Sequence, residues 1–447
     1  MSGSHRAPRG GARAAAREAR RAKARRRNQL IGVGAIAVIA IGGGGLAVVN
    51  AFGGGGTPGG AKSAVQNQKD GDKGNGDLLA DAKVLIDGTA AKPLTSTGAW
   101  AVAGTADGSG SPDKSFVCQA QRFADPAGVR TWVRTFRNAT TKDTAVQYVE
   151  VSNDTSAADK AYSTITGWLG QCNTPQVRLV ASYTTEGLGE RGVIAIFGQP
   201  TASLTNKYRT VSVTTAGQAT MVLEYDSTGG TPPKPDGVLA TASAGLKRIC
   251  ADAGADCGTG NLTAKAALLP SQEPPGFMAP IDLPVLSSVD KPWVSVSSGI
   301  RTGTGCEKID LKKAKSTKSK ALTYVVPEAQ VPTEFGLDTT VAEFANQTAA
   351  ASFVTLIRKN VDNCQKTTSN AKVKNTGTLT LSTVKGEAWK VSYDTGGGKI
   401  FTYRIGIAVS GTRSIYVLYP VLKNLDITDT AFTEILTRAS ERSAAFK

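Results

Sequence analysis

The chain contains an internal repeat, which constrains its fold more than any other feature of the sequence. Two segments share one pattern of apolar residues that ends in cysteine, at a constant offset of 192 residues. Both follow i, i+3, i+4, i+7 spacing, which predicts an amphipathic helix with the cysteine on its inner face. The matched positions are Ala158, Ala161, Tyr162, Ile165, Leu169 and Cys172, and Ala350, Phe353, Val354, Ile357, Val361 and Cys364.

The residues before each helix recur in the same order. A Leu-Leu pair, a tryptophan and a cysteine precede each helix: Leu78-Leu79, Trp100 and Cys118 in the first copy, and Leu268-Leu269, Trp293 and Cys306 in the second. Ser156 and Thr348 stand just before the two helices and are the predicted N-caps.

After the helices both copies change to the alternating pattern of strands. Glycine-containing turns at residues 216–218 and 410–411 join predicted hairpins, and each copy closes with a helix. The predicted strands are Gly192 to Phe197, Lys207 to Thr214, Thr220 to Tyr225, Glu387 to Tyr393, Ile400 to Val409 and Ser414 to Tyr419, and the closing helices are Gly237 to Cys250 and Thr428 to Ser440. The predicted fold class is therefore α+β, with two tandem copies of an antiparallel β-sheet packed with helices.

An uncharged run of twenty residues, Leu30 to Val49, precedes the repeats. A helix of this length spans the roughly 30 Å hydrocarbon core of a membrane. Residues 1–29 carry a net charge of +9, so we expect the N-terminus in the cytoplasm and the repeats outside. The alternative reading is a twin-arginine export signal, in which Arg26-Arg27 precedes the apolar run and cleavage occurs at Val49-Asn50-Ala51.

The predicted organisation follows from these boundaries. Residues 1–29 form a cytoplasmic basic tail, 30–52 a transmembrane helix preceding the repeats, 53–76 a flexible Gly-rich stalk, and 77–260 and 261–447 the two copies. The expected location is the cell membrane, as a single-pass protein with extracellular C-terminal domains.

Six cysteines lie beyond the predicted span, and an even number in an oxidising compartment predicts disulfides. The repeat selects among the pairings, since Cys118 with Cys172 and Cys306 with Cys364 occupy equivalent places. Cys250 and Cys257 remain as a local pair. The spacings match neither structural zinc nor a Cys-x-x-Cys redox pair, so we expect no metal.

The only histidine, His5, lies in the basic tail. Catalytic triads with histidine and histidine-ligated zinc enzymes are therefore excluded from the folded domains. No phosphate-binding glycine loop and no nucleophile elbow is present. We expect no catalytic activity and no cofactor, and a histidine-free cell-wall enzyme is kept only as a distant alternative.

Two features are candidates for a ligand surface. Tyr208-Arg209 and Tyr403-Arg404 are predicted to occupy equivalent strand positions in the two copies. Arginine can bind a carboxylate or phosphate. Packing tyrosines with solvated arginines is the alternative reading. The second feature is a cluster of lysines: Lys312, Lys313, Lys315, Lys318 and Lys320. Such a cluster can contact an anionic wall polymer or lipid headgroups, and the alternative interpretation is a solvated loop between strands.

The order of basic tail, span, stalk, Leu-Leu, Trp, Cys, helix and Cys resembles the extracellular sensor domains of actinobacterial membrane proteins, of the type attached to mycobacterial serine/threonine kinase H. The resemblance covers residues 77–447 and implies an α+β fold with a cleft that senses a ligand without catalysis. Two features depart from the family. No kinase domain is present, and the second copy has cysteines for one disulfide, where the family's domain has two.

The expected function is that of a membrane-anchored extracytoplasmic sensor or ligand-binding protein of the cell envelope. Its expected partners are a cell-wall or lipid ligand and a protein that receives the signal, because a tail of 29 residues is too short for an output enzyme. Nucleic acid is not expected. The alternative is an extracytoplasmic lipid carrier or structural envelope module, with an apolar pocket in each copy.

Overall fold

The computed structural model describes residues 78–447, apart from 202–204, 254, 256, 258–259, 287–288, 290, 300–304, 328–329 and 333–334. The predicted tail, span and stalk lie outside the described residues. Among the residues that are described, no helix combines the length and apolar character needed to cross a membrane. The described residues belong to one compact unit.

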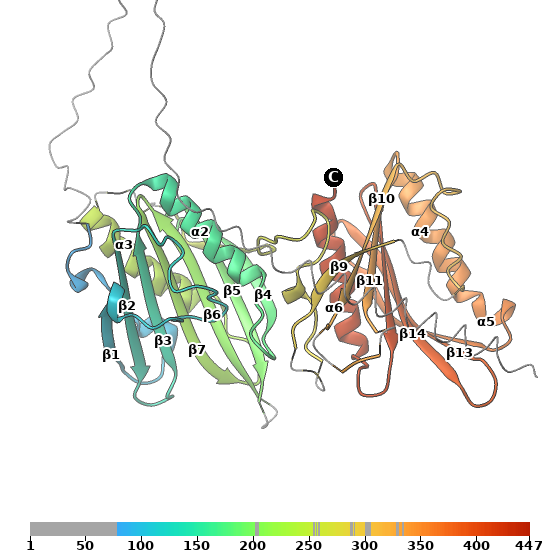
Figure 1. The fold of residues 1–447 in the computed structure, drawn as a ribbon, viewed down its shortest axis with the longest axis horizontal. Helices are drawn as coiled ribbons and strands as arrows, with labels where there is room; N and C mark the ends of the chain where they lie inside the picture. The colour runs from blue at the N-terminus through green and yellow to red at the C-terminus, as the bar shows by residue number, and fades with distance from the viewer. Residues whose placement is uncertain are drawn as a thin grey trace, which may run out of the picture. The chain divides into compact units, whose positions relative to one another are not determined.

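The first copy is a sheet with one long helix in the middle of its sequence and one after its last large strand (Figure 1). Its elements are β1 (Trp100–Asp107), β2 (Arg130–Asn138), β3 (Thr144–Val151), α2 (Thr155–Gly170), β4 (Arg178–Glu186), β5 (Arg191–Pro200), β6 (Asn206–Ala216), β7 (Ala219–Gly229), α3 (Asp236–Ala253) and β8 (Thr263–Ala266). Short 3-10 helices lie at Ala82–Val84, Lys92–Leu94 and Gly108–Gly110.

The second copy repeats this order. Its elements are β9 (Val294–Ser298), β10 (Lys318–Val325), β11 (Leu337–Glu343), α4 (Gln347–Asp362), α5 (Cys364–Thr367), β12 (Ala371–Thr380), β13 (Val384–Asp394), β14 (Ile400–Ser410), β15 (Arg413–Val421) and α6 (Asp429–Arg442). Short 3-10 helices lie at Pro280–Asp282 and Ser443–Ala445.

Apart from β8, which only the first sheet contains, the two sheets have the same topology, which confirms the predicted tandem α+β arrangement. The strand order is β1-β2-β3-β7-β6-β5-β4-β8 in the first sheet, and β9-β10-β11-β15-β14-β13-β12 in the second when read in the same direction. Every neighbouring pair is antiparallel. The predicted hairpins β6–β7 and β14–β15 are both present.

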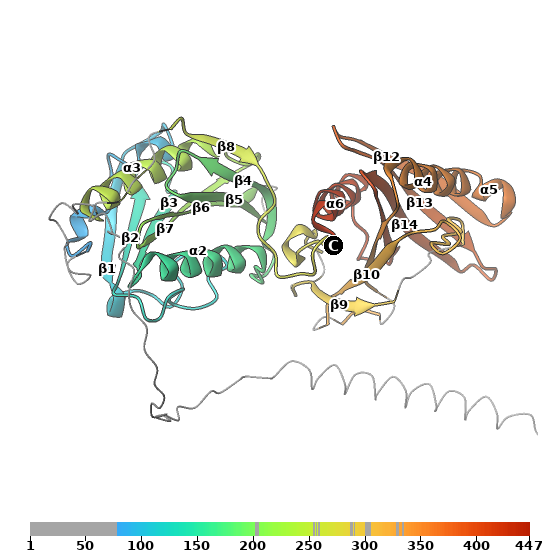
Figure 2. The same cartoon turned by 90° about the horizontal axis from the view of Figure 1, so that it is seen from above.

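Each sheet has one helix on each face, so each copy contains two apolar layers (Figure 2). In the first copy α2 covers one face and α3 the other, and α4 and α6 do the same in the second. Trp100 and Trp293 are buried on the equivalent faces, beneath α3 and α6, and Trp389 is buried beneath α4. These tryptophans are core residues.

The helix starts differ from the predicted N-caps. Asp154 caps α2 by accepting a bond from the Ala157 backbone N–H, and Asn346 caps α4 by accepting one from Ala349. The predictions of Ser156 and Thr348 were wrong by two residues. Both acceptors reach the orphan N–H groups of the first turn from the extended residue before the helix.

The connection between the copies is ordered: it forms a strand and a segment that packs into both copies. The small residues in its sequence did not predict this structure. Strand β8 lies beyond the predicted boundary at residue 260 and pairs with β4 of the first copy. The chain that follows, residues 268–286, contributes to two cores: Leu269, Ala279 and Ile281 pack with the α2 core, and Met278 and Leu283 with the α6 core. We call this segment the strap.

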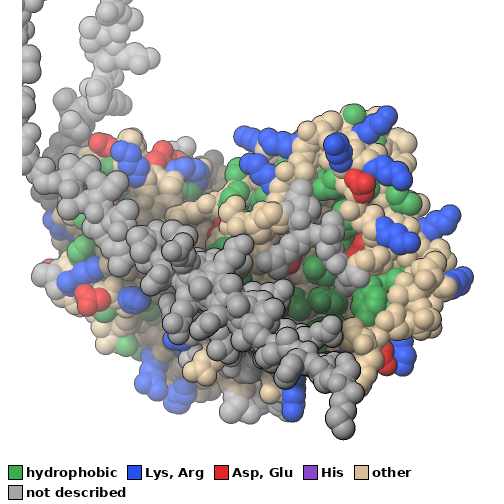
Figure 3. All heavy atoms as spheres, turned by 45° about the vertical axis from the view of Figure 1, so that its right-hand side comes forward, with side chains coloured by type: hydrophobic (Ala, Val, Ile, Leu, Met, Phe, Trp, Pro, Cys, Tyr) green, Lys and Arg blue, Asp and Glu red, His purple; other side chains and the backbone are tan. Residues whose placement is uncertain are grey.

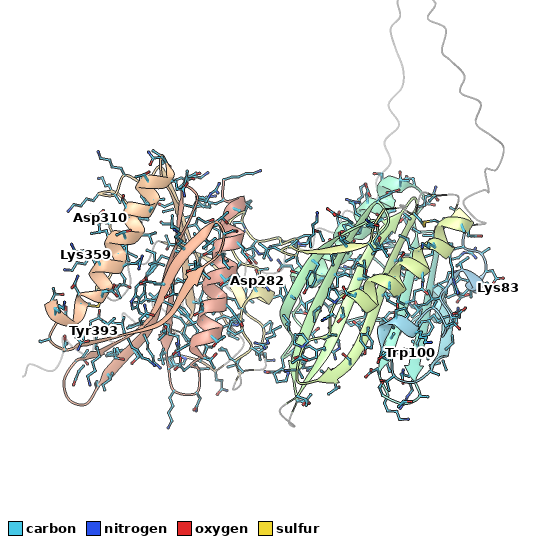
Figure 4. All side chains as sticks on the ribbon, turned by 180° about the vertical axis from the view of Figure 1, so that it is seen from behind. Lys83, Trp100, Asp282, Asp310, Lys359 and Tyr393 are labelled. Atoms are coloured by element: carbon cyan, nitrogen blue, oxygen red, sulfur yellow. A yellow bond between two sulfur atoms is a disulfide. The ribbon has the colours of Figure 1, made fainter. Side chains whose placement is uncertain are left out.

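An ion pair holds the strap against the last helix. Arg442 binds Asp282 through two nitrogens, at 2.8 and 3.2 Å, and donates a third bond to the Leu269 carbonyl at 2.6 Å. The Asp282 side chain is fully buried and that of Arg442 is 9% exposed. Figure 4 shows Asp282 in the strap. Such a bidentate pair gives the strap one defined position.

Candidate functional site

The three predicted disulfides are confirmed. Cys118 bonds Cys172 and Cys306 bonds Cys364, and each bridge ties a loop to the end of the first long helix of its copy. The third bridge joins Cys250 and Cys257 after α3. No free cysteine remains in the chain. This full pairing is the pattern of proteins that fold in an oxidising compartment.

The two Tyr-Arg pairs do not occupy equivalent positions, contrary to the prediction. The hairpin turns align Ala216 with Ser410, an offset of 194, whereas the two pairs are 195 residues apart. A shift of one residue moves a side chain to the opposite face of a strand. Arg209 therefore lies on the α2 face of its sheet, while Arg404 lies on the α6 face.

Arg404 serves to hold helix α6. Its side chain is 4% exposed and pairs with Asp426 at 2.8 Å and with Asp429 at the first turn of the helix. Burial lowers the pKa of Arg404, but its bonds to the two carboxylates outweigh this and raise the pKa overall. Lys390 also pairs with Asp426. The two carboxylates neutralise the charge of Arg404 and thereby hold α6 against the sheet.

Arg209 belongs to a different charged group. It approaches Asp226 at 3.6 Å and donates to Gln199 at 3.2 Å. Beside them lies Glu224, which is buried and accepts a bond of 2.6 Å from the Val117 backbone N–H. Burial raises the pKa of Glu224, and the neighbouring Asp226 carboxylate raises it further. Tyr208 faces the other side of the sheet and is buried.

A second buried acid lies on the same face. Glu150 accepts bonds from the backbone N–H groups of Ala124 and Asp125, at 3.2 and 3.0 Å. Burial raises its pKa to about 7, against the opposing effect of these two donors. Glu150 and Glu224 thus hold the loop that carries Cys118 against the sheet on both sides of that cysteine, at Val117 and at Ala124 and Asp125.

The sequence reasoning did not single out these acids, although a signal was present. Glu150 follows Val146 and Tyr148 at the inward positions of β3, and Glu224 follows Val222 in β7. An acid at an inward strand position is costly unless it is neutral or bonded. Both acids therefore stand at strand positions where the alternating pattern predicts an apolar residue, and this departure from the pattern was the available signal.

A groove of about 550 Å³ lies beside the strap. A shallower hollow of about 620 Å³ lies over the outer face of helix α4. Strand β4, the residues that follow β8, and helix α6 form the walls of the groove. Its volume falls within the usual range for small-molecule sites, about 300–1,000 Å³. The polar residues that line it are Arg178, Ser182, Tyr183, Asp282, Glu434, Thr437, Arg438 and Glu441.

Charge in the groove is only partly neutralised. Arg438 donates to the Val180 carbonyl at 3.3 Å and lies 3.7 Å from Glu441. Arg178 and Glu434 form no ion pair with any described residue. An arginine without a carboxylate partner presents donors suited to an anionic group. Smaller enclosed hollows of about 30 and 10 Å³ lie near the strap and beneath the loop before β10.

The predicted lysine cluster lies at one end of the second sheet. Lys312, Lys313 and Lys315 belong to the loop before β10, and Lys318 and Lys320 to β10 itself; all five are exposed. Figure 3 shows lysine and arginine side chains gathered along the upper edge of this copy with few acidic ones among them.

The described residues contain no group of three metal-ligating side chains. The sequence matches no protein-family model. It also matches no curated protein.

Solved structures give only remote overlays. They include an acyl-CoA thioesterase II, TesB2, from Mycobacterium marinum, with 8% identity, a TM-score of 0.13, and coverage of 62% of this chain and 93% of that one. DynU16, from the dynemicin biosynthetic locus, gives 11% identity, a TM-score of 0.11, and coverage of 67% and 95%. TM-scores this low support no inference about fold or activity, and no family is assigned to the chain.

Proposed function

We propose that this chain is a non-catalytic, ligand-binding protein that acts outside the cytoplasm, anchored by the apolar segment Leu30 to Val49. The groove beside the strap supports the ligand-binding part of the proposal. It has the volume of a small-molecule site and an arginine without a carboxylate partner. The three disulfides support an oxidising location.

The ligand class follows from the lining. Arg178 favours a carboxylate or phosphate, Glu434 favours a donor group, and the Tyr183 ring gives an apolar contact. We therefore propose a small polar ligand that carries an anionic group. A ligand there contacts β4 of one copy, the connecting segment and α6 of the other, so its occupancy reports on elements from both copies.

Native mass spectrometry of the full chain, purified in detergent from its own envelope, tests this proposal. We expect a bound small molecule that is lost in Arg178→Ala and kept in Arg137→Ala. Arg137 is an exposed strand arginine away from the groove, so it controls for the loss of one charge.

The competing functions give different results in the same experiment. A lipid bound equally to both variants would favour the carrier alternative. Turnover of a wall substrate by the purified chain would favour an enzyme and contradict the proposal. An unliganded chain that also fails to bind anything from envelope extracts would contradict it as well.

A further inference from the structure

The loop before β10 is held in place by its own contacts. The Lys313 backbone N–H donates to Asp310 Oδ1 at 2.9 Å, and the Ser316 N–H donates to the Leu311 carbonyl at 3.0 Å. Ile309, Leu311 and Ala314 pack against the core beneath α4. The lysines of this loop therefore project from a folded segment, which lowers the entropy lost when they bind a partner.

One of these lysines occupies an unfavourable backbone conformation. Lys315 has φ +56°, in the left-handed region where glycine is preferred. A residue with a Cβ costs about 1–2 kcal/mol there. A lysine at this position keeps a charge at the surface at the expense of local stability. Residues in such unfavourable backbone conformations are concentrated at functional sites.

Charge is distributed unequally between the copies. Lysine and arginine outnumber aspartate and glutamate by 23 to 16 over residues 261–447, against 16 to 17 over residues 77–260. We call Lys312, Lys313, Lys315, Lys318 and Lys320 the lysine rim. None of the five forms an ion pair with a described residue. Their charge is therefore available to an external anion.

The lysine rim follows the end of the sheet from one face to the other. Lys318 and Lys320 are spaced by two residues from Leu322 and Tyr324 of the α6 core, so they lie on the same α6 face, whereas the loop packs on the α4 side. Figure 4 places Asp310, at the start of the loop, and Lys359 along the α4 side of this copy. A flexible chain can follow this curved path.

The geometry points to a linear polyanion, a polymer with a repeating phosphate or carboxylate, as the partner of the lysine rim. Lysine is a point charge that suits repeated, loosely oriented anions, whereas arginine suits bidentate contacts. A flat bilayer is disfavoured because the rim spans two faces. The exposed side chains of Ile400 and Phe401, which could insert into lipid, lie at the start of β14. The turn between β14 and β15 is at the other end of that strand, and Lys318 lies beside this turn, opposite Glu343 in the strand register.

Binding of the full chain to long-chain inorganic polyphosphate, measured against salt concentration, tests the inference. Each neutralised phosphate adds about 0.7 to the slope of log affinity against log salt, by analogy with single-stranded nucleic acid. Five lysines then give a slope of about 3.5, or an affinity loss of about a hundredfold between 50 and 200 mM salt. Replacing all five with glutamine should lower the measured slope by about this amount, since the basic tail of residues 1–29 contributes equally in every variant.

A matched variant controls for total charge. It replaces five exposed lysines of the first copy with glutamine: Lys92, Lys114, Lys160, Lys234 and Lys247. We expect this control to retain the affinity and most of the slope. Equal losses in both variants would show a diffuse charge effect and overturn the inference.

Two further outcomes are decisive. Tighter binding to phosphatidylglycerol vesicles than to polyphosphate would identify a lipid surface and overturn the inference. An unchanged melting temperature would show that the rim variant is folded, so that loss of polyphosphate binding alone supports the polyanion site. The groove proposal has a separate readout and can fail without affecting this one.

Discussion

Replacing Glu150 with glutamine tests whether the buried acids set the pH dependence of stability. The folded pKa of Glu150 is about 7, against an ordinary value of 4.5, because burial disfavours the carboxylate. The folded state therefore keeps its proton at pH values where the unfolded chain has released it. As the pH rises from 4.5 to 7, the unfolded state binds fewer protons and the free energy of unfolding falls.

The shift of about 2.5 pK units corresponds to about 3 kcal/mol, at roughly 1.4 kcal/mol per unit. For a domain of this size, that loss lowers the melting temperature by about 6–12 °C. The stabilisation is fully present below pH 4.5 and is lost once the pH has passed 7. Glutamine has no proton to lose, so the variant should lack this contribution to the pH dependence.

Differential scanning calorimetry of wild type and Glu150→Gln from pH 4.5 to 8 measures the effect. Glutamine keeps one acceptor oxygen for the two N–H donors, so we expect the variant to be less stable at pH 4.5 and to converge with, or exceed, wild type at pH 8. Glu224 is present in both proteins and cancels in the difference. Glu190→Gln, at an exposed position, is the control. Parallel curves for wild type and Glu150→Gln would refute the reasoning.

Three further substitutions test the packing. Arg442→Ala leaves the buried Asp282 carboxylate without a counter-charge, although it still accepts a bond from the Ala279 backbone N–H. We expect a loss of about 3–5 kcal/mol in denaturant unfolding; a loss below 1 kcal/mol would show that the pair is dispensable. Gly170→Ala places a Cβ 2.1 Å from the Pro270 carbonyl oxygen and should cost about 1–3 kcal/mol in melting experiments, while unchanged melting would contradict close packing of the strap. Cys118→Ser opens a loop of sequence separation 54 and should destabilise by about 4 kcal/mol, read as faster proteolysis; equal resistance would contradict this.

Local patterns in the sequence were sufficient for the repeat, the hairpins and the disulfides. Apolar spacing depends on the 3.6- and 2-residue periods of helix and strand, which any segment carries by itself. The pairing of Cys306 with Cys364 followed from its equivalence to the first bridge. These features needed no knowledge of how the two sheets fold.

The three-dimensional fold decided the rest, because the relevant contacts join residues that are distant in the chain. The one-residue offset between the Tyr-Arg pairs emerged only when the β6–β7 hairpin was compared with the β14–β15 hairpin. Because of this offset, Arg209 and Arg404 lie on non-equivalent faces of their two sheets. The strap packs into two cores at once, which its composition does not reveal. The burial of Glu150 likewise depends on a loop folded over it, since a carboxylate changes its pKa only when its neighbours exclude water.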